Sequence, residues 1–207
     1  MSGRLGALLE EVRACTLCAE HLPLGPRPVL RAEATARVMI VGQAPGTKVH
    51  ASGVPWDDPS GQRLRAWLGL APEDFYDAGR VAILPMGLCY PGRLPRGGDA
   101  PPRPECAPLW HPRLRAELPA VELTVLAGSY AQARYLGKRR KRTLGETVAA
   151  WRSYLPDFLP TPHPSWRVNN WLKRNPWFEA EVVPELQARV AALTSRSSPR
   201  PPAGSSR

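Results

Sequence analysis

The chain of 207 residues has the length of one globular domain, and its 43% hydrophobic and 22% charged residues are ordinary for such a domain. No stretch approaches the roughly 20 consecutive apolar residues of a membrane-spanning helix, so we expect no membrane partner. The formal charge of +10 indicates a polyanionic partner or, equally well, a solvated arginine-rich surface.

The N-terminal segment is predicted to be a helix rather than a secretory signal. Residues 1–11 lack the basic-then-apolar order of such a signal. Leu5, Leu8, Leu9 and Val12 recur at helical spacing in an amphipathic segment that runs into Cys15. We therefore expect a protein of the bacterial cytoplasm, where structural disulfides are rare.

Strand and helix patterns alternate along the remaining chain. Short apolar runs predict strands at 37–42, 81–84, 123–128 and around 158–159. Helices are predicted at 60–68 and 129–136, capped by Ser60 and Ser129, and at 104–118, 144–154 and 177–193. Residues 195–207, made almost entirely of Ser, Pro, Gly, Ala and Arg, predict a disordered tail after a domain of residues 1–194.

This alternation predicts a three-layer α/β/α sandwich around a mostly parallel sheet of four strands. Ligands of such sheets bind at the carboxyl ends of the strands. The loops that follow Val41, Leu84 and Leu159 all leave from that edge, and we expect the functional site there.

Four cysteines require an explanation other than disulfides. Cys15 and Cys18 form a C-x2-C pair, Cys89 follows after 70 residues and Cys106 after another 16. Four thiolates suit a [4Fe–4S] cluster or a structural zinc ion, and spacing alone does not separate the two. Four unrelated buried thiols are the third possibility.

Two loops carry candidate chemistry. The first begins with Gly42-Gln43-Ala44-Pro45-Gly46 and continues to Trp56, and its glycines allow close approach of a ligand to the backbone. The second reads His163-Pro164-Ser165-Trp166-Arg167, in which prolines hold the histidine and Trp166 and Arg167 offer an aromatic plane and a cation to a base stack.

Together these motifs make the chain resemble the uracil-DNA glycosylase superfamily from Cys15 to about Leu193. The loop from Gly42 occupies the place of the first superfamily motif, and His163-Pro164-Ser165 that of the second. The cysteine pattern is similar to that of the iron–sulfur branch called family four, which favours a [4Fe–4S] cluster over zinc. The stretch from His163 to Asn169 also resembles the second motif of the single-strand-selective branch.

The resemblance implies a mechanism in which the target nucleotide is flipped out of the DNA. Trp56 would stack on the flipped base, and Trp166 and Arg167 would fill the gap in the duplex. His163 would donate a hydrogen bond to the uracil carbonyl oxygen as negative charge develops there, and water would be the nucleophile. Gly42, Gln43, Ala44, Pro45, Gly46 and Ser165 would complete the base pocket.

Two departures from the family pattern affect the predicted site. The first motif has Gln43 and Ala44 where relatives place a carboxylate or an amide, so Asp57, Asp58 or His50 become candidates for activating water, and Gln43 for catalysis or base binding. Pro85 replaces the asparagine that reads uracil in relatives, so backbone groups of Met86 or Gly87 would have to substitute. Uracil, hypoxanthine and xanthine therefore remain candidate substrates.

Three functions are open at this stage. The first is a monofunctional DNA glycosylase, acting as a monomer on DNA that contains a deaminated base and associated with the nucleoid. The second is a damage-binding protein of the same fold without turnover. The third is a metal-stabilised nucleic-acid module in which the basic turn of residues 138–142 grips phosphates.

Overall fold

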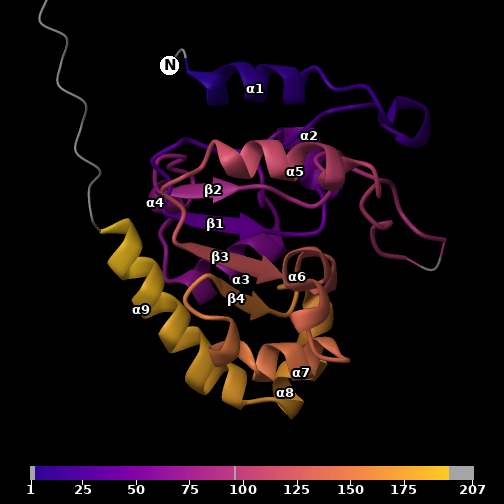
Figure 1. Cartoon of the computed structure of the whole chain (residues 1–207). Coiled ribbons are helices and arrows are strands. Elements are labelled where there is room, and N and C mark those ends of the chain that lie inside the picture. Colours follow the sequence, from indigo (N-terminus) through magenta and orange to yellow (C-terminus); the bar gives the residue numbers. More distant parts are fainter. Residues whose placement is uncertain (1–2, 96, 196–207) are drawn as a thin grey trace, which may run out of the picture.

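The computed structural model describes residues 3–95 and 97–195, so the predicted tail, apart from Ser195, lies outside the described residues. The strands are β1 (Val38–Val41), β2 (Val81–Ile83), β3 (Leu123–Ala127) and β4 (Phe158–Thr161). They form one sheet in the order β2-β1-β3-β4, and every pair is parallel. The predicted four-stranded parallel sheet is therefore confirmed, with β4 at one edge (Figure 1).

Helices cover both faces of the sheet, which confirms the three-layer architecture (Figure 1). Alternating residues of β1 point to opposite faces: Met39 packs with α1 and α5, whereas Ile40 packs with α3 and α9. The helices are α1 (Arg4–Arg13), α2 (Thr47–Ser52), α3 (Pro59–Leu68), α4 (Pro72–Phe75), α5 (Cys106–Ala116), α6 (Ser129–Leu136), α7 (Leu144–Ala149), α8 (Asn169–Arg174) and α9 (Val183–Thr194).

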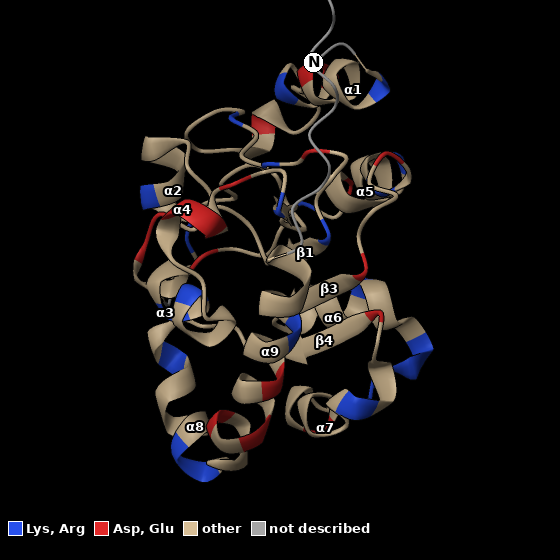
Figure 2. Ribbon diagram, turned by 90° about the vertical axis from the view of Figure 1, so that its left-hand side faces the viewer, with Lys and Arg blue, Asp and Glu red and all other residues tan. Residues whose placement is uncertain are grey.

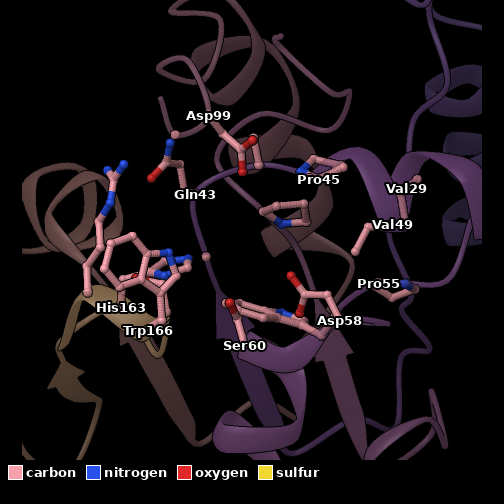
Figure 3. A pocket seen from close by; sticks show the side chains of 18 of the residues that line it. Val29, Gln43, Pro45, Val49, Pro55, Asp58, Ser60, Asp99, His163 and Trp166 are labelled. Atoms are coloured by element: carbon pink, nitrogen blue, oxygen red, sulfur yellow. The ribbon is translucent and has the colours of Figure 1, made fainter. Parts of the chain in front are cut away.

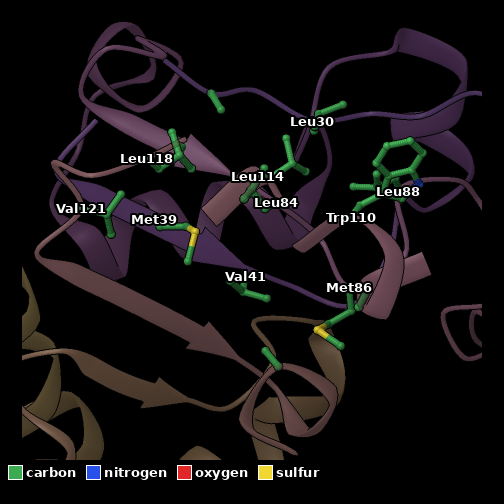
Figure 4. Packing of buried hydrophobic residues seen from close by; sticks show 14 of the residues in the cluster. Leu30, Met39, Val41, Leu84, Met86, Leu88, Trp110, Leu114, Leu118 and Val121 are labelled. Carbon is green, nitrogen blue, oxygen red and sulfur yellow. The ribbon is translucent and has the colours of Figure 1, made fainter. Parts of the chain in front are cut away.

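The core on the α1 and α5 side combines strand residues with the apolar faces of these helices (Figure 4). Leu114 of α5 lies beside Leu84, and Trp110 of the same helix lies beside Leu88; all four side chains are buried. The opposite core contains Phe178, which packs edge-to-face against Trp67 of α3 with ring centroids 4.9 Å apart. Because β1 and β3 are covered on both faces, the carboxyl edge of the sheet is held rigidly.

Helix boundaries differ from the sequence prediction in several places. Short helices α2, α4 and α8 lie in segments for which no helix was predicted. The predicted helix at 144–154 ends at Ala149 and is followed by a 3₁₀ turn, Trp151–Tyr154, and the predicted helix at 177–193 opens with a π-helical segment, Phe178–Val182.

Both predicted serine caps are wrong. Helix α3 begins at Pro59 and is capped by Asp58, whose carboxylate accepts a hydrogen bond from the Gly61 N–H at 2.8 Å. Helix α6 has Ser129 as its first residue, and Gly128, at φ +92°, occupies the cap position without a side-chain bond.

Basic side chains are spread over several elements rather than gathered on one helix. Figure 2 shows Lys and Arg on α1, α3 and α8, whereas α4 carries acidic residues. Among the described residues, no helix combines the length and apolar character needed to cross a membrane.

Candidate active site

A cavity of about 620 Å³ opens at the carboxyl ends of the strands, where the sequence predicted a site. Its volume falls in the range of pockets for small ligands and leaves room for more than a single pyrimidine ring. Among the predicted site residues, those that line it are Gly42, Gln43, Ala44, Pro45, Gly46, Trp56, Asp58, His163, Ser165, Trp166 and Arg167.

Trp56 is held in a strained position against the floor of this cavity. Its φ of +59° is unusual for a residue with a bulky side chain and costs about 1–3 kcal/mol. Two glycines make room for it: a Cβ at Gly42 would lie 2.5 Å from Cζ2 of the indole, and a Cβ at Gly61 would lie 1.8 Å from the Trp56 carbonyl oxygen. The Tyr76 hydroxyl donates to that same oxygen at 3.3 Å. The indole is therefore fixed before any ligand binds.

His163 lies beside Trp56 in the loop that follows β4. The two rings have centroids 5.6 Å apart and are inclined by 32°. His163 also packs against Gly128, at which a Cβ would lie 3.2 Å from the His163 Cβ. Burial lowers the pKa of His163 from 6.5 to about 4, so the imidazole is neutral near pH 7. A neutral imidazole carries one N–H donor and one acceptor nitrogen.

Gln43 contributes an amide to the cavity wall. Its Nε2 donates to the carbonyl oxygen of Ala100 at 3.1 Å, which ties the first motif to the long loop between β2 and α5. Figure 3 shows Gln43 and His163 on the same side of the cavity, with Asp58 and Ser60 facing them. Segments that are 120 positions apart in the sequence, Gln43 and His163, thus share one cavity.

Several residues predicted at the site are placed elsewhere. Asp57 is exposed and does not line the cavity. The N–H groups of Met86 and Gly87 donate to the carbonyl oxygens of Gly42 and Gln43, both at 2.9 Å. Because these bonds continue the pairing between the strands, neither amide is available to a base. The N–H groups of Met86 and Gly87 therefore cannot replace the missing asparagine, and neither residue lines the cavity.

The second motif ends in an exposed tip at the rim of the cavity. Trp166 is 74% exposed, and the Arg167 guanidinium lies 5.6 Å from the centre of its ring. Arg63 of α3 donates to the carbonyl oxygen of Ser165 at 2.8 Å and anchors the base of the tip. An exposed aromatic side chain on an anchored loop is suited to insertion between stacked bases.

The sequence prediction missed part of the cavity wall. Asp99 and Arg93, from the loop between β2 and α5, also line the cavity. That loop contains no recognised motif. The one sequence feature that could have indicated it is that the loop leaves the same edge of the sheet as the two motif loops. His50, a predicted candidate for water activation, does not line the cavity, and its ring lies 6.0 Å from that of Tyr90.

The four cysteines line a second, smaller pocket together with Leu22, Pro26, Pro28, Gly87, Leu88, Arg103 and Trp110. The Leu88 N–H donates to Sγ of Cys106 at 3.3 Å. Burial, with a contribution from the neighbouring thiols, raises the pKa of Cys89 to about 11 and that of Cys106 to about 12. Thiolates in this pocket therefore require a compensating positive charge.

The four thiols share one pocket and are the residues that could hold a metal group in it. Within the part of the chain that the structure describes, no three His, Cys, Asp or Glu side chains converge on one metal position. Zinc needs four sulfur atoms roughly 4 Å apart around one point. A [4Fe–4S] cluster places each thiolate on a different iron.

The basic turn of residues 138–142 lies away from the cavity. The Arg139 guanidinium sits 5.2 Å from the ring centre of Phe158, the first residue of β4, whereas the cavity is at the carboxyl ends of the strands. The turn is exposed and lines no part of the cavity. The basic turn therefore does not contribute side chains to the cavity formed by the two motif loops.

A parallel sheet with a polar and aromatic cavity at its carboxyl edge defines an α/β protein built to bind a ligand between its loops. Residues 31–187 match the model of the uracil DNA glycosylase superfamily. The match covers more than half of the chain, and the chain therefore belongs to this superfamily. Its members act on DNA, and membership supports a function of the DNA glycosylase type.

Proposed function

We propose that the protein excises uracil, or a related deaminated base, from DNA as a monofunctional glycosylase and leaves an abasic site. The observation that carries the proposal is the shared cavity of Gln43, Trp56 and His163, which belong to two motifs far apart in the sequence. The cavity has room for a nucleoside, and its aromatic and polar lining suits a base.

In this proposal the flipped base stacks on Trp56. Stacking on an aromatic side chain contributes about 1–3 kcal/mol, and it compensates part of the few kcal/mol spent on unstacking the base from the duplex. Trp56 packs in the space that Gly42 and Gly61 leave, so no further rearrangement is needed to form the stacking platform. Trp166 and Arg167 at the rim would occupy the gap that the base leaves.

His163 would stabilise the departing base. Cleavage of the N-glycosidic bond moves negative charge onto the base, and a neutral imidazole can direct its N–H at a carbonyl oxygen on which that charge develops. Donors aimed at developing charge contribute about 2.7–4 kcal/mol in other enzymes. The lowered pKa of His163 ensures that the ring is uncharged before the reaction.

Base recognition would fall to Gln43. Its amide nitrogen already donates to Ala100, which fixes the side chain and leaves its carbonyl oxygen and second amide hydrogen for a base edge. A uracil edge offers both acceptors and a donor. Hypoxanthine offers a similar edge, so it is the first alternative substrate to compare.

We further propose that Cys15, Cys18, Cys89 and Cys106 hold a [4Fe–4S] cluster. Their common pocket and the N–H donor from Leu88 support a site for four thiolates, and the resemblance of the cysteine pattern to that of the iron–sulfur branch favours the cluster over zinc. Bound there, the cluster would supply cross-links between the N-terminal segment and the loop between β2 and α5. Asp99 and Arg93 of that loop line the cavity, so ordering the loop also shapes the cavity.

The experiment uses purified full-length protein and labelled oligonucleotides, single- and double-stranded, that carry one uracil, hypoxanthine or xanthine. Alkali cleaves the strand at any abasic site that forms. We expect cleavage at uracil and none with a matched oligonucleotide that carries thymine. Because Trp56 is the proposed stacking platform for the flipped base, the Trp56→Ala variant should lose most of this cleavage activity.

Other outcomes point to other functions. Binding of the uracil oligonucleotide without cleavage would instead indicate a damage-binding protein, a possibility that the absence of a carboxylate in the first motif keeps open. Equal binding of all oligonucleotides without cleavage would contradict any role in base recognition.

A further inference from the structure

The carboxylates at the cavity are candidates for handling the nucleophilic water. Of the acidic residues that the structure describes, Asp58 and Asp99 line the cavity. Asp58 caps α3: its side chain accepts the Gly61 N–H at 2.8 Å. Its carboxylate is thus committed to the helix, and a change in its position would disturb the platform that α3 helps to hold.

Asp99 differs because its carboxylate has no hydrogen bond or ion pair with any other residue that the structure describes. It lies against the first motif: a Cβ at Gly46 would be 3.4 Å from its Oδ2, and the next residue, Ala100, accepts the hydrogen bond from Gln43. Figure 3 shows Asp99 beside Gln43 at the cavity. A carboxylate therefore stands next to the first motif, although the motif itself contains none.

The loop holds Asp99 in place through its backbone. Arg93 and Asp99 form an antiparallel bridge, and the Ala100 N–H donates to the Gly92 carbonyl oxygen at 2.8 Å. Partial burial, and to a smaller extent Asp58, raises the pKa of Asp99, while Arg93 and Arg167 oppose the rise. A carboxylate with a raised pKa is a better base than one in free solution.

We propose that Asp99 is the catalytic carboxylate that orients and deprotonates the attacking water, an inference that rests on the proposed glycosylase function. The water oxygen forms a bond to C1′ of the deoxyribose as the bond from C1′ to the base nitrogen breaks. The electron pair of the broken bond leaves with the base, and one water proton moves to the Asp99 carboxylate. The base leaves as an anion hydrogen-bonded to His163 and is later protonated from solvent.

The test compares Asp99→Asn with Asp157→Asn in single-turnover cleavage of the uracil oligonucleotide. Asn keeps the size of the side chain but cannot accept a proton, so we expect the rate to fall by about 100-fold or more with DNA affinity within about twofold of wild type. Asp157 is exposed and directly precedes β4, so it lies at the amino ends of the strands, away from the cavity. The Asp157→Asn variant should retain the wild-type rate.

A second variant separates catalysis from structure. In Asp99→Ala the missing carboxylate leaves space, and added formate should restore part of the rate in a concentration-dependent manner. A residue that only shapes the loop would show no such rescue. If wild type is active and Asp99→Asn is equally active, or if formate leaves Asp99→Ala unchanged, Asp99 is not the base and the proposed function stands. An inactive wild type would instead remove the proposed function, and the role of Asp99 with it.

Discussion

His163 combines two properties that rarely occur together at one residue: it faces a wide cavity and its surroundings keep it neutral. Trp56 and Gly128 both pack against this residue, so water reaches little of the ring. A charged imidazole would gain hydration only by leaving this position. The same packing that lowers its pKa therefore sets the orientation of its N–H group.

Replacing this residue tests its role in catalysis. We expect His163→Ala to lower the single-turnover rate on uracil DNA at least tenfold, because the departing base loses its hydrogen-bond donor. Affinity for the DNA should change little, since Trp166 and Arg167 remain. His21→Ala, at an exposed histidine, is the control. An unchanged rate in His163→Ala would exclude it from the mechanism.

The lowered pKa of His163 also predicts a dependence of stability on pH. The unfolded chain takes up this proton near pH 6.5, but the folded chain does so only near pH 4. The neutral ring thus favours the folded state fully above pH 6.5, and this preference is lost as the pH falls toward 4. Denaturant titrations should find that wild type loses about 1–2 kcal/mol more between pH 7 and pH 5 than His163→Gln does. An equal loss in both proteins would contradict the lowered pKa.

At the residue scale, sequence reasoning found side chains that belong to compact motifs. His163 and Trp56 were predicted because prolines, glycines and aromatics mark their loops. Asp99 was not predicted, because its approach to Gln43 depends on how the loop between β2 and α5 folds back through the Ala100 carbonyl. Met86 was assigned to the site in error, since a strand pattern does not reveal which amides remain free after pairing.

At the scale of elements, α3 links the platform to the second motif. Its cap, Asp58, follows Trp56 by two positions, and its Arg63 holds the Ser165 carbonyl oxygen at 2.8 Å. Movement of α3 would therefore displace residues on both sides of the cavity. Sequence periodicity located this helix but not its cap, because Pro59 at the first helical position moves the start one residue toward the N-terminus.

The capping role of Asp58 can be measured directly. Asp58→Ala removes the acceptor for the Gly61 N–H and should lower the free energy of unfolding by about 1 kcal/mol. Asp58→Asn keeps an oxygen at that position and should lose only a small part of this free energy of unfolding. Chemical denaturation monitored by circular dichroism provides both values. Equal losses for the two variants would indicate that Asp58 acts through its charge rather than as a cap.

The strands were predictable as elements because each is a short apolar run buried on both faces. Short helices such as α2 and α8 were not, because six residues contain too few turns for a periodic pattern. Tertiary contacts supply what the pattern lacks: Arg27, from the proline-rich segment before β1, donates to the last carbonyls of α2 at His50 and Ala51.

At the scale of the whole molecule, the cysteine pocket joins three parts of the chain that are distant in sequence. Cys15 and Cys18 follow α1, Cys89 follows β2, and Cys106 begins α5. Ligation of one cluster by all four would restrain the N-terminal segment against the loop that carries Asp99. If the proposed cluster is bound, metal content would bear on the stability of the entire fold.

Replacing one cysteine tests this assignment. Cys106→Ser should lose the broad visible absorbance of an iron–sulfur protein and bind far fewer than about four irons per chain. It should also lower the free energy of unfolding by about 2 kcal/mol or more. Leu109→Ala, an exposed substitution in the same helix, is the control. A wild-type protein that is colourless and contains zinc would contradict the cluster.

The position of β4 at one edge of the sheet has a consequence for heat inactivation. This strand pairs only with β3, yet the loop after it delivers His163 to the cavity. Opening of an edge strand costs less free energy than global unfolding. Hydrogen exchange should accordingly find the amides of β4 less protected than those of β1, and activity should disappear on warming before the rest of the fold melts. The temperature at which activity is lost would then be set by an edge strand, not by the core.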